Sequence, residues 1–176
     1  MFSKIIQLIL VSTSMSPILL TFWFKDFSRD WDIIEGWYFL AISIFLLFVL
    51  FTTLKTAKNK LEVLPVKISE ISNADNESIV FIFTYLIPLL DISTSMIIFL
   101  VILFFIILLN TNIYHFNPVL GILGYHQYEI KLKEGTSFIL ITKKALVNSS
   151  QIKFVVQLTN YILLEKEDKL WIYFVY

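Results

Sequence analysis

The chain has 176 residues, of which 57% are hydrophobic and 16% are charged, and its mean hydropathy is +0.78. Soluble domains carry about 25% charged residues, so this composition excludes an ordinary soluble fold and favours an integral membrane protein. The net charge is zero, which argues against direct nucleic-acid binding by this chain. The chain contains no cysteine, which excludes disulfides, thiol catalysis and Cys-ligated zinc.

The first predicted membrane span covers residues 5–24, an apolar run without charge that is long enough to cross about 30 Å of hydrocarbon. Pro17 and several Ser and Thr residues interrupt this run. A cleaved signal peptide has a similar layout, with Lys4 before a short apolar core. Because the run continues to residue 24 and no small-residue cleavage site follows, we expect a retained anchor.

The second predicted span covers residues 37–54 and contains no charge, no proline and no glycine. It ends in Lys55, Lys58 and Lys60, and lysines at this position stay on the cytoplasmic side of a membrane. The sequence therefore predicts a polar cytoplasmic segment over residues 55–71, either a structured loop or a short amphipathic piece along the headgroups.

Residues 78–109 form a long apolar stretch with one charge, Asp91. A single helix of this length would reach about 48 Å at 1.5 Å per residue, which exceeds one bilayer crossing. Pro88 and Asp91 mark a break in the stretch. We therefore predict a third span over residues 72–90 and a fourth over residues 94–114.

The distribution of Lys and Arg places the N-terminus and the segment after the second span in the cytoplasm. Four spans then return the C-terminus to the cytoplasm, which makes this a multi-pass protein with both termini inside. If residues 78–109 cross only once, the C-terminal part lies outside instead.

The C-terminal part, residues 115–176, contains several short runs that alternate apolar and polar residues, separated by turn-type clusters. None of these runs is long enough to cross a membrane. The predicted fold class is therefore a membrane α-helical domain with four spans, residues 1–114, followed by a small β-rich domain that forms a barrel or a curled sheet.

Asp91 is the first candidate functional residue. A carboxylate within a bilayer usually marks an ion pathway or a contact between protomers. A turn residue at the outer interface, capping the next helix, is the simpler interpretation, and the preceding Pro88 favours it.

No constellation of catalytic residues is recognisable. The two histidines, His115 and His126, lie beside aromatic residues without a set of further ligands, and no nucleophile or phosphate-binding motif is present. The sequence therefore predicts no enzyme activity, no cofactor and no metal.

Asn117 and Pro118 form a turn-initiating pair where the fourth span ends. Gly121 and Gly124 follow and supply backbone freedom where the chain enters the first strand. A hinge that passes membrane strain to the C-terminal domain is the functional alternative.

The stretch TYLIPLLD, residues 84–91, the helix after it, and the stretch NPVLGILGYHQYEI, residues 117–130, resemble the KwaA family, the membrane subunit of the Kiwa anti-phage defence system. In the second stretch the motif residues are Asn117, Pro118, Gly124, Tyr125, Tyr128 and Glu129. These stretches cover about a third of the chain.

The resemblance implies a bacterial inner-membrane protein with four spans that assembles as a homo-oligomer, expected to be a tetramer. It also implies a soluble DNA-binding partner subunit at the cytoplasmic face, which interferes with phage DNA after the membrane subunit senses infection. The residues themselves suggest an alternative, an oligomeric channel or pore-forming effector opened on infection or stress, because Asp91 and the hydroxyl-rich first span are polar. A lipid-modifying membrane enzyme is the third interpretation and lacks any acid–base pair.

Overall fold

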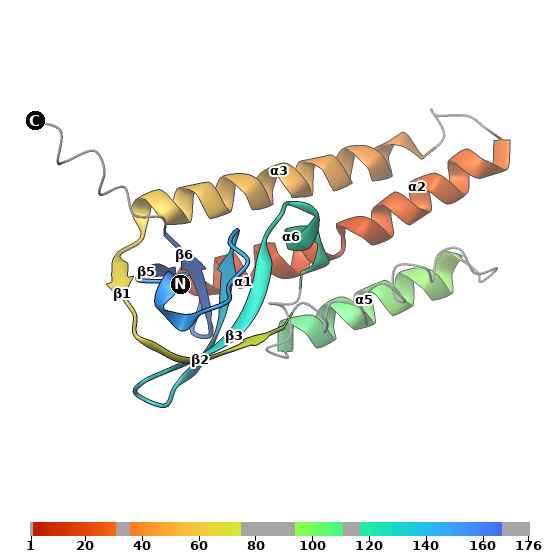
Figure 1. Ribbon diagram of the computed structural model, residues 1–176. Coiled ribbons are helices and arrows are strands. Elements are labelled where there is room, and N and C mark those ends of the chain that lie inside the picture. The colour runs from red at the N-terminus through yellow and green to blue at the C-terminus, as the bar shows by residue number, and fades with distance from the viewer. Residues whose placement is uncertain (1, 31–35, 75–93, 111–116, 167–176) are drawn as a thin grey trace, which may run out of the picture.

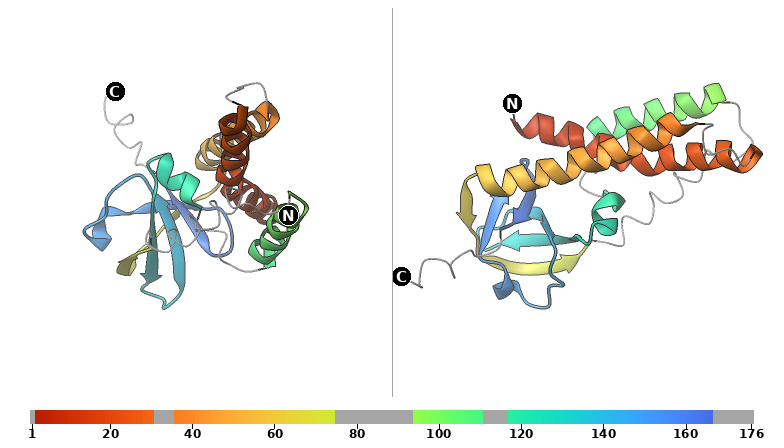
Figure 2. Two further views of the ribbon diagram at one scale, coloured as in Figure 1. Left: turned by 90° about the vertical axis from the view of Figure 1, so that its right-hand side faces the viewer. Right: turned by 90° about the horizontal axis from the view of Figure 1, so that it is seen from above.

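The computed structural model describes residues 2–30, 36–74, 94–110 and 117–166 (Figure 1). Long helices run side by side (Figure 2). A curled sheet lies beside the C-terminal end of the helix Trp37–Lys60, which leads into the first strand.

The first helical rod consists of α1 (Phe2–Ser14) and α2 (Ser16–Asp30), which are separated at Met15. Pro17 has no N–H, so it cannot donate to the carbonyl of Thr13 and interrupts the helical hydrogen bonds at this point. The Ser43 hydroxyl donates to the Ser16 carbonyl at 3.2 Å and so connects α3 to the start of α2, next to the break. Taken together, Ser3–Ser28 is long and apolar enough to cross a membrane.

The second rod is α3 (Trp37–Lys60), which packs antiparallel against α1 and α2. Gly36 precedes it with a left-handed φ of 70°, and a Cβ there would lie 2.7 Å from the Asp26 carboxylate. The rings of Phe22 and Phe39 stack with their centroids 5.2 Å apart. Like the first rod, α3 is long and apolar enough to span a bilayer.

The remaining long helix is α5 (Thr94–Asn110), whose end lies against α1, where the Gln7 side chain donates to the Leu109 carbonyl at 3.1 Å. Its apolar part, Ile98–Asn110, is shorter than a full crossing. The predicted fourth span reaches residue 114, beyond the described part of α5.

The prediction of four spans is supported in part. Helices of sufficient length occupy the first two predicted spans, residues 5–24 and 37–54. The third, residues 72–90, lies outside the described residues except at its start, where residues 72 and 73 belong to a strand.

The sheet has six strands in the order β1-β5-β6-β4-β3-β2. Neighbouring strands are antiparallel except for the parallel pair β4 and β6. The strands are β1 (Val63–Pro65), β2 (Ile68–Asn73), β3 (His126–Leu132), β4 (Ser137–Thr142), β5 (Phe154–Gln157) and β6 (Ile162–Glu165). Since β1 and β2 occupy the two edges yet are joined by only Val66 and Lys67, the sheet must curl to bring its edges together (Figure 1).

The sheet confirms the predicted strand-rich C-terminal region and also draws in residues 63–73 from the segment after α3. The sequence analysis treated that segment as polar and did not predict its strands. Pro65 ends the three-residue β1, and the β2–β3 register shifts between Ile68 and Glu70, so no clean alternation is visible in the sequence.

The central strands β4 and β6 are buried on both faces. Side chains such as Leu140, Val155 and Leu163 fill the inside of the curl. Their neighbours Ile141, Val156 and Leu164 point the other way and join one core with Leu10 of α1 and Leu54 of α3. Only the central strands are buried on both sides, and the outer strand β3 keeps the alternation that the sequence shows.

Candidate functional site

Asn117 caps the short helix α6 (Pro118–Ile122), which leads from the helices into β3. Its side-chain oxygen accepts a hydrogen bond from the Val119 N–H at 3.0 Å, and Pro118 occupies the first helical position, where no N–H is needed. The turn predicted at this pair is therefore the start of a capped helix.

The same Asn117 side chain also bonds to α1. Its amide donates to the Leu10 carbonyl at 3.1 Å and to the Thr13 hydroxyl at 2.8 Å. The Gln127 amide in β3 donates to the Asn117 carbonyl at 3.2 Å. The side chains of Thr13, Asn117 and Gln127 are all buried. They form a polar junction that connects α1, α6 and the sheet within an apolar core.

The two candidate hinge glycines differ in conformation. Gly124 has a left-handed φ of 76°, which only glycine adopts without strain, whereas Gly121 has no such φ. A Cβ added at either position would meet nothing within 4 Å. Backbone freedom is therefore required at Gly124 alone, and the hinge function of both remains a prediction.

Tyr125 follows Gly124, and its ring lies near two lysines. The Nζ of Lys58, at the end of α3, is 5.7 Å from the centroid of the Tyr125 ring, and the Nζ of Lys143, after β4, is 4.9 Å from it. The ring is 8% exposed. It therefore joins the end of the second span to the sheet through two cation–π contacts.

Tyr128 and Glu129 point to opposite faces of β3. Tyr128 is buried inside the curl, and its hydroxyl accepts a hydrogen bond from the Leu146 N–H at 3.0 Å. Glu129 is exposed on the polar surface formed with Glu70 and Lys131. The structure thus gives Tyr128 a packing position and Glu129 a surface position.

Glu165 is a buried carboxylate that the sequence analysis did not single out. It accepts hydrogen bonds from the Thr142 hydroxyl and from the Lys144 ammonium group. Its side chain is 5% exposed and that of Lys144 is 50% exposed. The buried charge is therefore neutralised at the end of β6.

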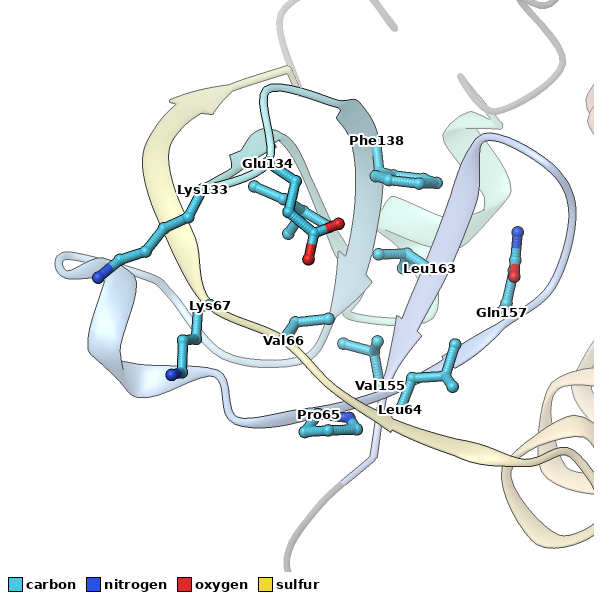
Figure 3. A pocket seen from close by; sticks show the side chains of 11 residues that line it. Leu64, Pro65, Val66, Lys67, Lys133, Glu134, Phe138, Val155, Gln157 and Leu163 are labelled. Carbon is cyan, nitrogen blue, oxygen red and sulfur yellow. The ribbon is translucent and has the colours of Figure 1, made fainter.

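A pocket of about 470 Å³ opens into the curled sheet, and strands and turns of the sheet line it throughout (Figure 3). Phe138, Leu163 and Val66 line its apolar part, the Glu134 carboxylate lies at its mouth, and Lys67 and Lys133 extend outward from one side of the rim (Figure 3). Its volume is in the range of small-ligand and peptide-anchor pockets. The full lining is Leu64, Pro65, Val66, Lys67, Leu132, Lys133, Glu134, Phe138, Val155, Gln157 and Leu163.

The structure brings Asn117, Pro118, Gly121, Gly124 and Tyr125 together at the junction of helices and sheet. Asp91 and Pro88 lie outside the described residues. Within the described ranges, no three His, Asp or Glu side chains gather where they could hold a metal ion.

Sequence reasoning missed the partners of these residues. Thr13 appeared only as part of a hydroxyl cluster, and Lys58 only as a topology signal. The pairs they form join residues roughly 70 to 100 positions apart, and local patterns carry no information about such contacts.

The searches of curated proteins and of solved structures returned no match. A family model described as anti-phage protein KwaA matches residues 6–164, which include nearly all of both long rods, the sheet up to Leu164 and the polar junction. Because the match covers nearly the whole chain, this protein belongs to the KwaA family of anti-phage proteins.

Proposed function

We propose that the chain is the membrane-embedded subunit of a Kiwa defence system, which oligomerises, senses infection at the envelope and recruits a cytosolic DNA-binding effector. In this proposal the chain is not an enzyme. It positions the effector through its sheet.

Membrane embedding is supported by large apolar side chains exposed on α3 and α5. Phe45 and Phe48 of α3 are 62% and 64% exposed, and Phe99 of α5 is 61% exposed. Soluble monomers rarely expose such continuous apolar faces. Further exposed members are Ile42, Ile44 and Phe51 on α3, and Met96, Ile98, Ile102, Leu103, Ile106 and Ile107 on α5.

The strand pairing supports one side of the membrane for all six strands. The Ala74 N–H donates to the Gln127 carbonyl at 3.0 Å, and β2 pairs with β3 along its length. The strands before and after α5 therefore lie on the same side of any membrane that the chain spans. The lysines at the end of α3, next to β1, favour the cytoplasmic side.

The observation that carries effector recruitment is the pocket inside the sheet. It lies on the side that the lysines of α3 assign to the cytoplasm, its lining is mostly apolar, and its rim carries Lys67 and Lys133 against one acid, Glu134. A protein anchor with an apolar side chain and acidic neighbours fits this combination. We therefore place the effector contact at the pocket rim.

The channel alternative is weakened by the contacts of the hydroxyl groups that suggested it. Thr13 and Ser14 are buried, and their hydroxyls donate to the carbonyls of Leu10 and Val11. Ser43 is likewise buried and bonded to Ser16. These groups stabilise the helix break instead of lining a pore.

Affinity purification in a mild detergent tests the proposal in cells that carry the whole defence system. The wild-type chain should recover a DNA-binding partner, and the cells should resist phage in a plating assay. The double variant Lys67→Glu/Lys133→Glu reverses the rim charge and should lose both partner and protection at unchanged membrane abundance.

The matched control is Lys153→Glu, an exposed lysine outside the pocket, which should keep both properties. Recovery of the partner by the rim variant would contradict the assigned contact. A wild-type chain that recovers no partner and protects no cells would contradict the function itself.

A further inference from the structure

The contact between α3 and the sheet places two cations at the end of a predicted membrane span. The apolar part of α3 ends just before Lys55, and Lys58 lies one turn later, half-buried against Tyr125. Lysines at this position lie at the level of lipid headgroups. Because Lys143 approaches the same ring, the sheet adds a second cation at that level.

Lys58 and Lys143 differ from two other lysines, Lys131 and Lys144, which have acidic partners. Lys144 pairs with Glu165, and Lys131 lies 3.8 Å from Glu70. Among the described residues, no carboxylate lies within ion-pair distance of Lys58 or Lys143. Within this part of the chain their positive charge is therefore not neutralised by a carboxylate and is available to an anion.

An exposed apolar side chain lies close to Tyr125 in the sequence. Ile122, three residues before Tyr125, is 79% exposed, although Val119 and Leu120 in the same short helix are buried. Leaving an isoleucine this exposed is unfavourable in water and suits contact with lipid acyl chains. The combination of two cations and an exposed apolar side chain close by in the sequence matches the two ends of a phospholipid.

We propose that Lys58, Lys143 and the Tyr125 ring form a binding site for the phosphate group of an anionic phospholipid, with Ile122 directed toward its acyl chains. The proposal rests on the membrane embedding argued above. The Tyr125 ring positions the two ammonium groups, which bind the phosphate oxygens directly.

The test uses the full-length chain purified in an uncharged detergent. Thermal unfolding is followed by tryptophan fluorescence while phosphatidylglycerol or phosphatidylcholine is added. A ligand that binds only the folded state raises the Tm with concentration. Phosphatidylglycerol should raise the Tm of the wild type, this rise should shrink at high salt, and phosphatidylcholine should have no comparable effect.

The double variant Lys58→Gln/Lys143→Gln should bind phosphatidylglycerol roughly 25-fold more weakly, about fivefold for each lysine near the headgroups. The control variant Lys131→Gln/Lys153→Gln has the same net charge, changes two exposed lysines outside the pocket, and should bind like the wild type. Equal affinity in the two double variants, or equal Tm shifts with both lipids, would overturn the proposal.

Soluble anions separate a lipid site from a free-phosphate site. Inorganic phosphate and glycerophosphoglycerol should not reproduce the Tm shift, and a full shift with either would overturn the lipid assignment. Carbonate extraction tests the embedding separately. If the chain stays in the membrane pellet and phosphatidylglycerol does not bind, only this inference fails.

Discussion

The side chain of Asn117 uses every polar atom it has. Its oxygen caps α6, and its amide bonds to the Leu10 carbonyl and the Thr13 hydroxyl of α1. The sequence predicted a turn at Asn117 because Asn-Pro is a local signal. The bonds to α1 were not predictable, since they depend on how two distant segments pack.

Replacing Asn117 by Ala should lower stability by about 2–3 kcal/mol, because both the cap and a buried contact to α1 are lost. For a chain of this size the Tm should fall by roughly 5–10 °C, measured by tryptophan fluorescence in detergent. Asn110→Ala is the control, since the Asn110 side chain is exposed and bonds only within α5 in the described structure. Equal losses in the two variants would contradict the assigned junction.

Removing the lysine from each of the two described ion pairs should lower stability by different amounts. Lys144→Met leaves the buried Glu165 carboxylate without its cation and should cost about 1–3 kcal/mol, reduced from a fully buried pair because Lys144 is half-exposed. Lys131→Met removes a surface pair and should change stability by less than about 1 kcal/mol. Thermal unfolding of both variants side by side checks the order, and a larger effect at Lys131 would reverse the interpretation.

Among the elements, α3 and the strand-rich C-terminal region were predicted, whereas β1 and β2 were not. The apolar run of residues 37–54 has no interruption, so its length and composition were sufficient. The strands β1 and β2 are short, and a register shift and Pro65 obscure their pattern. They exist because strands β5 and β3 offer them partners, which is a tertiary effect.

Replacing Gly121 in α6 and Gly124 in the turn after it should affect stability differently. Gly124→Ala forces an L-residue into a left-handed conformation and should destabilise the chain by about 1–2 kcal/mol. Gly121→Ala adds a methyl group that meets nothing within 4 Å and favours helix, so it should be neutral or stabilising by up to about 1 kcal/mol. Thermal unfolding measures both. Loss of phage resistance in Gly121→Ala, at normal stability and abundance, would instead favour the hinge.

For the whole molecule, the predicted division into apolar helices and a strand-rich part was recovered from composition and periodicity. The sheet nevertheless combines strands from before and after α5, which a reading in chain order separates. The pairing of those strands also constrains the topology more strongly than charge counting does, because Ala74 and Gln127 are hydrogen-bonded to each other.

The absence of cysteine from the sequence makes this topology directly testable. Glu134→Cys, at the exposed β3–β4 turn, should resist a membrane-impermeant maleimide in intact spheroplasts and react after lysis. Trp37→Cys, 60% exposed at the opposite end of α3 from the sheet, should react without lysis. Labelling of Glu134→Cys in intact spheroplasts would place the sheet outside.

The pairing of β1 with β5 also has a consequence for synthesis of the chain. Val63 pairs with Val156, so β1 leaves the ribosome roughly 90 residues before its partner, a delay of about 5–20 seconds at ~5–20 residues per second. During that interval α5 is synthesised and has to reach its position beside α1 while the edge strands β1 and β2 are still unpaired. Chains that stop before β5 should therefore aggregate or be degraded, and the defence subunit becomes competent only when nearly all of it has been made.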